Sequence, residues 1–301
     1  MSSVRPTFDP PERRTEVVGA LTLADLGPLG RRPLSLVFVV AAAGLALSHA
    51  SLIASDLAIG VPLDVAAFAA VSAATQTMVV LLPAALLWRV PTAPRTHRTL
   101  LVGLALGALV EMLRLGAAFA STSFSDPSIG PGLNTLAWLV LPAASLLVGL
   151  GLLHLRAGRM TRRGMLVVIA SMYLVLSLVP LGAELIGNEP VFVTWVFLVS
   201  GILVPLAAAF AGWVPVDAWL AGERPSRFWG LLALGVPLYV VGALLGGEWL
   251  LPAWLALPAD PAAVNDIVLA SAGLGGILTL AAVGLAFVAY ARLTPSPPES
   301  S

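Results

Sequence analysis

Cysteine is absent from the 301 residues of this chain, and lysine is absent too, because all 16 basic residues are arginine. Without cysteine the chain can form no disulfide, no thiol nucleophile and no cysteine-ligated zinc or iron–sulfur site. Charged residues make up only 11% of the sequence, against roughly 25% in soluble domains. The 16 acidic residues balance the arginines, so no net charge favours nucleic acid as a partner.

Motifs for catalysis and cofactor binding are also missing. The sequence has no H-E-x-x-H, no adjacent Glu-Glu pair, no G-x-S-x-G and no P-loop. We expect His97 and His154 to be solvated or interfacial near one face of a membrane and His49 to lie towards the other, so the three histidines cannot form one metal site or a haem-ligating pair. The sequence therefore predicts no catalytic residue, no metal site and no cofactor.

Apolar residues are what the chain has in abundance. They make up 58% of it, and the mean hydropathy is +0.96. A helix that rises 1.5 Å per residue needs about 20 apolar residues to cross a bilayer core of roughly 30 Å. Eight stretches meet this length, at residues 34–54, 65–88, 99–119, 133–154, 164–186, 191–213, 228–247 and 267–290. They predict an all-α, polytopic integral membrane protein with a bundle of about eight transmembrane helices.

The arginines predict the orientation of these helices. Fifteen of the 16 fall in the N-terminal tail, in every second connection or after the last helix. The other connections carry acidic residues and no arginine: Asp56, Asp64, Asp126, Glu189, Asp260 and Asp266. Since cytoplasmic loops retain positive charge, we expect both termini in the cytoplasm and the protein in the cytoplasmic membrane of the cell. All eight tryptophans fall near predicted helix ends, the level that indole rings prefer.

The predicted domain organisation is simple. Residues 1–33 form a proline-rich, flexible cytoplasmic tail, residues 34–292 the transmembrane domain, and residues 293–301 a short cytoplasmic tail. The first tail lacks the apolar core of a cleavable signal peptide, so the first helix is expected to direct insertion. No connection is long enough for a soluble domain, which argues against a receptor or kinase with its own output module.

An internal repeat is a further possibility. Four arginines precede every second predicted helix at spacings of 64 to 66 residues: Arg32, Arg98, Arg163 and Arg227. Three of the other helices carry a mid-span proline and are expected to kink there: Pro83, Pro142 and Pro205. One interpretation is four helical hairpins, with four helices in each of two parallel repeats. The other is that alternating topology alone places arginine at every second helix start.

Ionisable residues within a membrane span are the first candidates for a functional site. The stretch 99–119 contains Glu111 and Arg114, which are three residues apart and can pair on one helix face together with the GxxxG step at Gly103 and Gly107. His49 and Gln76 lie at similar depth in the first two helices. These four, Glu111, Arg114, His49 and Gln76, are the predicted intramembrane polar site.

The polar site has two interpretations. In the first, the Glu–Arg pair fixes helix packing in a small accessory or structural subunit, whose partners are the lipid bilayer and other membrane subunits or a second copy of the chain. In the second, the site belongs to a small-molecule permease or an ion- or proton-coupled carrier whose ligand the sequence does not identify. An intramembrane enzyme is the weakest alternative, because no catalytic set is visible. We favour the first, because structural ion pairs also bury charge.

Overall fold

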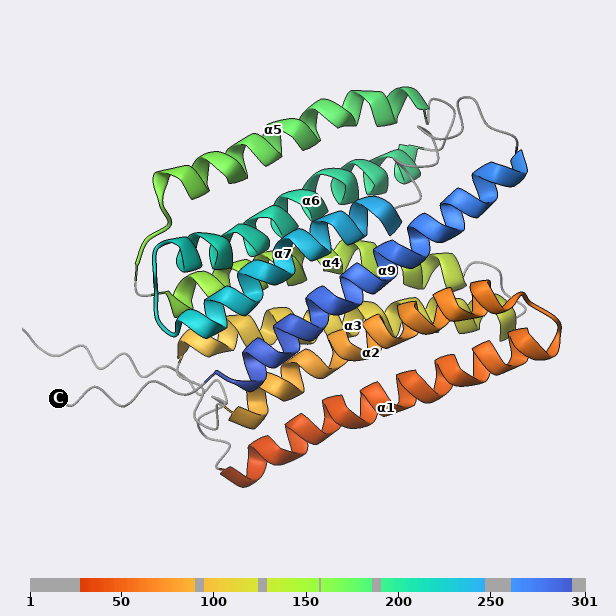
Figure 1. Ribbon diagram of the computed structural model, residues 1–301, viewed down its shortest axis with the longest axis horizontal. Helices are drawn as coiled ribbons and strands as arrows, with labels where there is room; N and C mark the ends of the chain where they lie inside the picture. The colour runs from red at the N-terminus through yellow and green to blue at the C-terminus, as the bar shows by residue number, and fades with distance from the viewer. Residues whose placement is uncertain are drawn as a thin grey trace, which may run out of the picture.

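The computed structural model describes residues 28–89, 95–123, 129–156, 158–185, 191–246 and 261–293. Side chains are described throughout these ranges except at 28–33, 89, 95–96, 121–123, 174–202, 205, 246 and 261–268. The described residues form eight α-helices and no strand (Figure 1). Their bounds are α1 Pro28–Ala58, α2 Leu63–Arg89, α3 Arg95–Ser123, α4 Ile129–Leu155, α5 Arg162–Leu185, α6 Val191–Leu220, α7 Ser226–Gly246 and α9 Pro261–Ala291.

Six of these helices are long and apolar enough, over their described residues, to cross a membrane. They are α1, α2, α3, α4, α7 and α9, and α6 adds a shorter apolar stretch at Leu206–Leu220. The all-helical fold and the membrane class are therefore confirmed. Each of the eight predicted stretches coincides with a described helix, whereas kinks at Pro83, Pro142 and Pro205 stay a prediction.

The helices extend beyond the predicted apolar stretches. α1 begins at Pro28 and α9 at Pro261, the first helical position at which proline's missing N–H is harmless. α6 ends at Leu220, seven residues after the predicted end at 213, because the chain turns only at Gly222, whose φ is +71°. There the N–H of Glu223 donates to the carbonyl of Ala218 at 3.0 Å, as in a Schellman motif.

Consecutive helices run in opposite directions along one common axis (Figure 1). We call one end of the bundle the arginine end: α1, α3, α5 and α7 begin there, and α2, α4, α6 and α9 end there. The opposite end is the acidic end. α1 begins at the arginine end and α9 ends there, as expected for an even number of alternating helices.

The packing of the helices repeats with a period of four. Six helices form a closed ring in the order α2, α3, α4, α6, α7 and α9, while α1 packs outside α2 and α5 outside α6. Every neighbour pair recurs four helices later: α3–α4 as α7–α9, α2–α3 as α6–α7, and α4–α6 as α9–α2. The first half (α1–α4) and the second half (α5, α6, α7 and α9) therefore pack alike, and equivalent helices point the same way.

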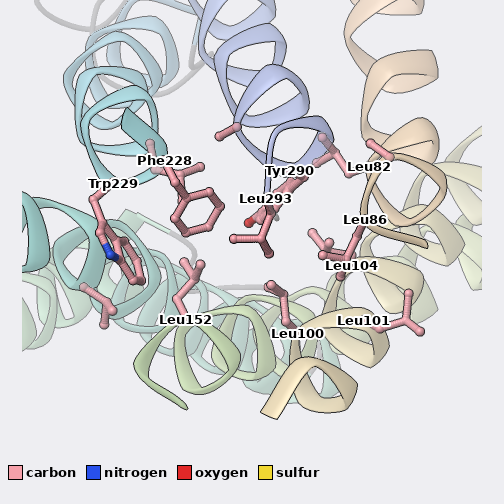
Figure 2. Packing of buried hydrophobic residues seen from close by; sticks show 14 of the residues in the cluster. Leu82, Leu86, Leu100, Leu101, Leu104, Leu152, Phe228, Trp229, Tyr290 and Leu293 are labelled. Carbon is pink, nitrogen blue, oxygen red and sulfur yellow. The ribbon is translucent and has the colours of Figure 1, made fainter. Parts of the chain in front are cut away.

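Large buried side chains gather at the arginine end. One cluster joins the last turns of α2, α6 and α9 to the first turns of α3 and α7 (Figure 2). Trp229 is 1% exposed and packs edge-on against Phe228, with ring centroids 4.9 Å apart. Trp229 lies near the start of α7, the helix end at which it was predicted, but its side chain points into the ring. Several buried residues nearer the acidic end are alanines: Ala66, Ala73, Ala117, Ala120 and Ala137.

Glycines set the closest helix contacts. A Cβ atom on Gly103 of α3 would lie 2.6 Å from the backbone nitrogen of Val148 in α4, and one on Gly242 of α7 would lie 2.8 Å from the carbonyl oxygen of Gly275 in α9. Backbones can approach this closely only where a side chain is missing. Gly107 has its nearest neighbour, Val79 of α2, at 4.0 Å, so only the first glycine of the predicted GxxxG step is in close contact.

Candidate functional site

The first three helices meet in a small buried apolar layer at mid-length. Its centre is formed by Ala42 of α1, Val80 of α2 and Ala108 of α3. Residues three, four or seven positions apart share a helix face. His49, Gln76 and Glu111 are seven, four and three residues from these three, so each shares the face of its partner. In each case the polar residue lies further towards the acidic end. The apolar layer thus positions the three polar side chains above it.

His49 and Gln76 are in direct contact. The Nε2 atom of His49 lies 2.7 Å from Oε1 of Gln76, so the imidazole donates this hydrogen bond when Nε2 carries the proton. His49 is also close enough to Glu111 for the two to interact electrostatically. The contact joins α1 to α2 in a region where water is scarce.

Glu111 and Arg114 pair on α3 as predicted from their spacing. Nη1 of Arg114 donates to Oε1 of Glu111 at 3.1 Å, and the guanidinium also lies 5.4 Å from the ring centroid of Trp138 in α4. The Glu111 side chain is 10% exposed, and its second carboxylate oxygen, Oε2, is buried with no hydrogen-bond partner among the described residues. The polar residues therefore connect all four helices of the first half, and their functional role stays a prediction.

The second half has no such cluster at the aligned positions. When Arg98 is aligned with Arg227, Val240 and Ala243 take the places of Glu111 and Arg114. When the buried prolines Pro83 and Pro215 are aligned, Ala208 takes the place of Gln76. The same helix arrangement is therefore built once with polar residues at these positions and once with apolar ones.

A buried ion network at the arginine end was not predicted. Arg156, the first residue after α4, has a side chain with no exposed surface; it donates to Asp217 of α6 at 2.8 Å and to Glu223, after α6, at 2.6 and 2.8 Å. Asp217 also accepts from the backbone N–H of Thr161 at 2.8 Å and from its hydroxyl. Burial opposes the charged form of Arg156, but the hydrogen bonds to Glu223 and Asp217 outweigh it and raise the arginine's pKa. The network ties the α4–α5 connection to α6.

The sequence held a signal for this network. Asp217 is an acidic residue in the apolar run WVPVDAWL, at the end of the bundle where arginines collect. Ending the predicted helix at 213 placed Asp217 in a loop, where a charge needs no partner. Of the two expectations for His97, solvated or interfacial, the first is wrong: α3 begins at Arg95, so His97 lies in its first turn and is only 7% exposed.

Neither of two hollows found on the described surface borders the polar cluster. The larger, of about 510 Å³, lies between the end of α4, the start of α5 and Phe210 of α6, and we call it the α5 hollow. The smaller, of about 390 Å³, lies beside Arg227 and Arg292. Among the residues that the structure describes, no three His, Asp or Glu side chains come together as a metal site.

No protein-family model, no curated protein and no solved structure matches this chain. Its function therefore has to be inferred from its own residues.

Proposed function

We propose that all eight helices cross the bilayer of the cytoplasmic membrane, with the arginine end in the cytoplasm. α5 and α6 have 24 and 30 residues, so they are about 36 and 45 Å long, enough to cross a core of roughly 30 Å. The collection of arginines at one end favours this orientation.

Cysteine labelling can test this topology without background, because the chain has no cysteine of its own. Single cysteines at positions 126, 188 and 262 should react with an impermeant maleimide on intact cells. Cysteines at 94, 160 and 224 should react only after permeabilisation. Labelling of any of these last three from outside would rule out the eight-span arrangement.

For the function itself, we propose a small accessory or structural membrane subunit in which the polar cluster fixes the packing of the first half. The observation that carries this proposal is that the four polar residues contact one another or lie within electrostatic range, while neither hollow reaches them. The His49–Gln76 hydrogen bond joins α1 to α2, and Arg114, paired with Glu111 on α3, also lies against the Trp138 ring of α4. These contacts restrict how the helices can slide or rotate. Buried polar groups can specify one arrangement in this way.

A charge-removal cycle tests the structural role. Glu111→Gln or Arg114→Gln leaves one buried charge without its partner and should lower the free energy of unfolding by about 3–5 kcal/mol. The double variant should regain much of this loss, because its two amides can hydrogen-bond each other. Thermal stability in detergent is the measurement, and full stability of both single variants would refute the structural role.

A second candidate, an ion- or proton-coupled carrier, is favoured by one observation. Oε2 of Glu111 is buried without a hydrogen-bond partner among the described residues, although carboxylate oxygens are acceptors that usually find one. A proton or a cation bound to that oxygen would supply the missing partner. Uptake assays in proteoliposomes under a proton gradient distinguish the candidates: a flux that Glu111→Gln abolishes without loss of stability would favour the carrier.

A further inference from the structure

The α5 hollow is walled by apolar side chains and opens sideways from the bundle. Leu153 of α4, Met165 and Ile169 of α5 and Phe210 of α6 line it, and its volume of about 510 Å³ falls within the 300–1,000 Å³ typical of small-molecule sites. Met165 and Ile169 remain 55% and 44% exposed. Because the surroundings of this surface are lipid, an apolar wall of this kind is in contact with acyl chains rather than water.

The first half shows how this position looks when the chain fills it. Aligning Arg32 with Arg163 places Leu34 and Phe38 of α1 at the positions of Met165 and Ile169. Leu34 and Phe38 pack against the buried cluster at the arginine end. In the second half, the aligned side chains border a hollow instead. The comparison indicates that the missing occupant is apolar and is not supplied by the described part of the chain.

The mouth of the hollow is positively charged. Arg159 lines it, and the exposed Arg162 and Arg163 begin α5 within one turn of Met165. The nearest acidic groups of the network, Asp217 and Glu223, are already bound by the buried Arg156. An occupant with an apolar body and a negative head would satisfy both the walls and the mouth.

We propose that the α5 hollow binds an anionic phospholipid of the surrounding bilayer, with an acyl chain along Met165, Ile169 and Phe210 and its phosphate at Arg159 and Arg162, the arginine on the same face of α5 as Met165 and Ile169. A basic pocket between membrane helices is a recognised setting for such head groups, and a guanidinium can hold a phosphate through two parallel hydrogen bonds. This inference goes beyond the proposed function, since it uses neither Glu111 nor the ion network.

The test compares lipids and variants of the full chain in detergent. Native mass spectrometry and thermal unfolding are measured with phosphatidylglycerol, with phosphatidylcholine of the same acyl chains, and with inorganic phosphate. Phosphatidylglycerol should bind with one molecule per chain and raise the melting temperature, because it binds only the folded protein. Phosphatidylcholine and inorganic phosphate should do so much less.

Two kinds of variant examine the two ends of the lipid. Arg159→Gln with Arg162→Gln should weaken phosphatidylglycerol binding about fivefold for each charge removed, whereas Arg224→Gln, an exposed arginine at the same end, should not. Ile169→Phe places in the hollow the side chain that the first half has there and should weaken binding of the lipid. Leu166→Phe, an exposed position that does not line the hollow, is its control.

Each outcome decides the proposal. Melting temperatures without added lipid show whether the variants fold, and Ile169→Phe keeps the test open if the arginine variant does not. Equal binding of phosphatidylcholine, equal stabilisation by inorganic phosphate, or unchanged phosphatidylglycerol binding in Ile169→Phe would each overturn it. Selective binding of phosphatidylglycerol that both kinds of variant weaken would support it.

Discussion

The two halves of the molecule have the same helix packing and different polar residues. In the first half, His49, Gln76, Glu111 and Arg114 connect α1 to α4 within the span. In the second half, the aligned positions that the structure describes hold Ala208, Val240 and Ala243. The second half therefore reaches the same helix packing with small and apolar residues at these positions, whereas in the first half we propose that the polar contacts add a restriction on how α1 to α4 slide and rotate.

The ends of α4 and α9, which occupy equivalent places at the arginine end, also differ in their polar contacts. Arg156 after α4 is buried against Asp217, whereas Arg292 after α9 is exposed, and the α2 residue aligned with Asp217 is Ala85. Leu152 of α4 and Val214 of α6 belong to the same apolar cluster that joins α9 to α2 (Figure 2). The ions therefore add a constraint between α4 and α6 to a contact that apolar residues already provide.

The largest effect on stability is expected when the buried arginine after α4 is removed and compared with the exposed arginine after α9. Arg156→Met removes the partner of two buried carboxylates and should lower the free energy of unfolding by about 3–5 kcal/mol. Arg292→Met, at the aligned and exposed position, should change stability little. Unfolding in mixed detergent micelles measures both, and equal losses would contradict the comparison.

Close glycine contacts should sharpen the likeness of the halves. Gly103→Ala and Gly242→Ala each force a backbone apart and should cost about 1–3 kcal/mol, by similar amounts in the two halves. Gly44→Ala and Gly284→Ala have nothing within 4 Å of the new methyl group and should be neutral or slightly stabilising. Denaturant midpoints of all four provide the measurement; losses at Gly44→Ala or Gly284→Ala as large as those at Gly103→Ala and Gly242→Ala would contradict the close helix contacts.

A smaller effect is expected at the His49–Gln76 contact. Gln76→Ala gives the first half the residue that the second half has and removes one hydrogen bond, which is worth about 1 kcal/mol. Thr75→Ala is the matched control, because the Thr75 hydroxyl bonds only to the carbonyl of Val71 in its own helix. A loss no greater than that of the control, by thermal unfolding, would show that the contact does not hold α1 in place.

The smallest change in stability is expected when α3 receives the residues that α7 has at the two aligned positions. Glu111→Val together with Arg114→Ala places Val240 and Ala243 equivalents in the first half and leaves no unpaired charge. Since apolar replacement of a buried ion pair is often neutral or stabilising, we expect less than about 1 kcal/mol of change. Severe destabilisation of this double variant, by the same unfolding assay, would show that the halves are not interchangeable in packing.

Much of the fold could be predicted because a bilayer imposes helix length and direction on the sequence. The apolar stretches located every described helix, and the three-residue spacing predicted the contact between Glu111 and Arg114. His49 and Gln76 were predicted to lie at a similar depth to that pair. That their helix faces meet follows only from the packing of Ala42, Val80 and Ala108.

The features at the arginine end could not be predicted in the same way. Hydropathy marks where the apolar run stops, not where the helix stops, so Asp217 and His97 were placed outside the core. A count of charges likewise cannot separate Arg156, which turns inward, from Arg159, which does not. Such distinctions depend on contacts between segments far apart in the sequence.

The closed ring has a consequence for how the protein is made. Its last contact joins α9 to α2, and about 200 residues separate the ends of these two helices in the chain. At a synthesis rate of 5–20 residues per second, about 10 to 40 s pass between completion of α2 and completion of α9. During that interval the face of α2 that later packs against α9 lacks that partner. The first half is therefore the part of the nascent protein for which contacts among α1–α4 alone must suffice, and the polar cluster lies within it.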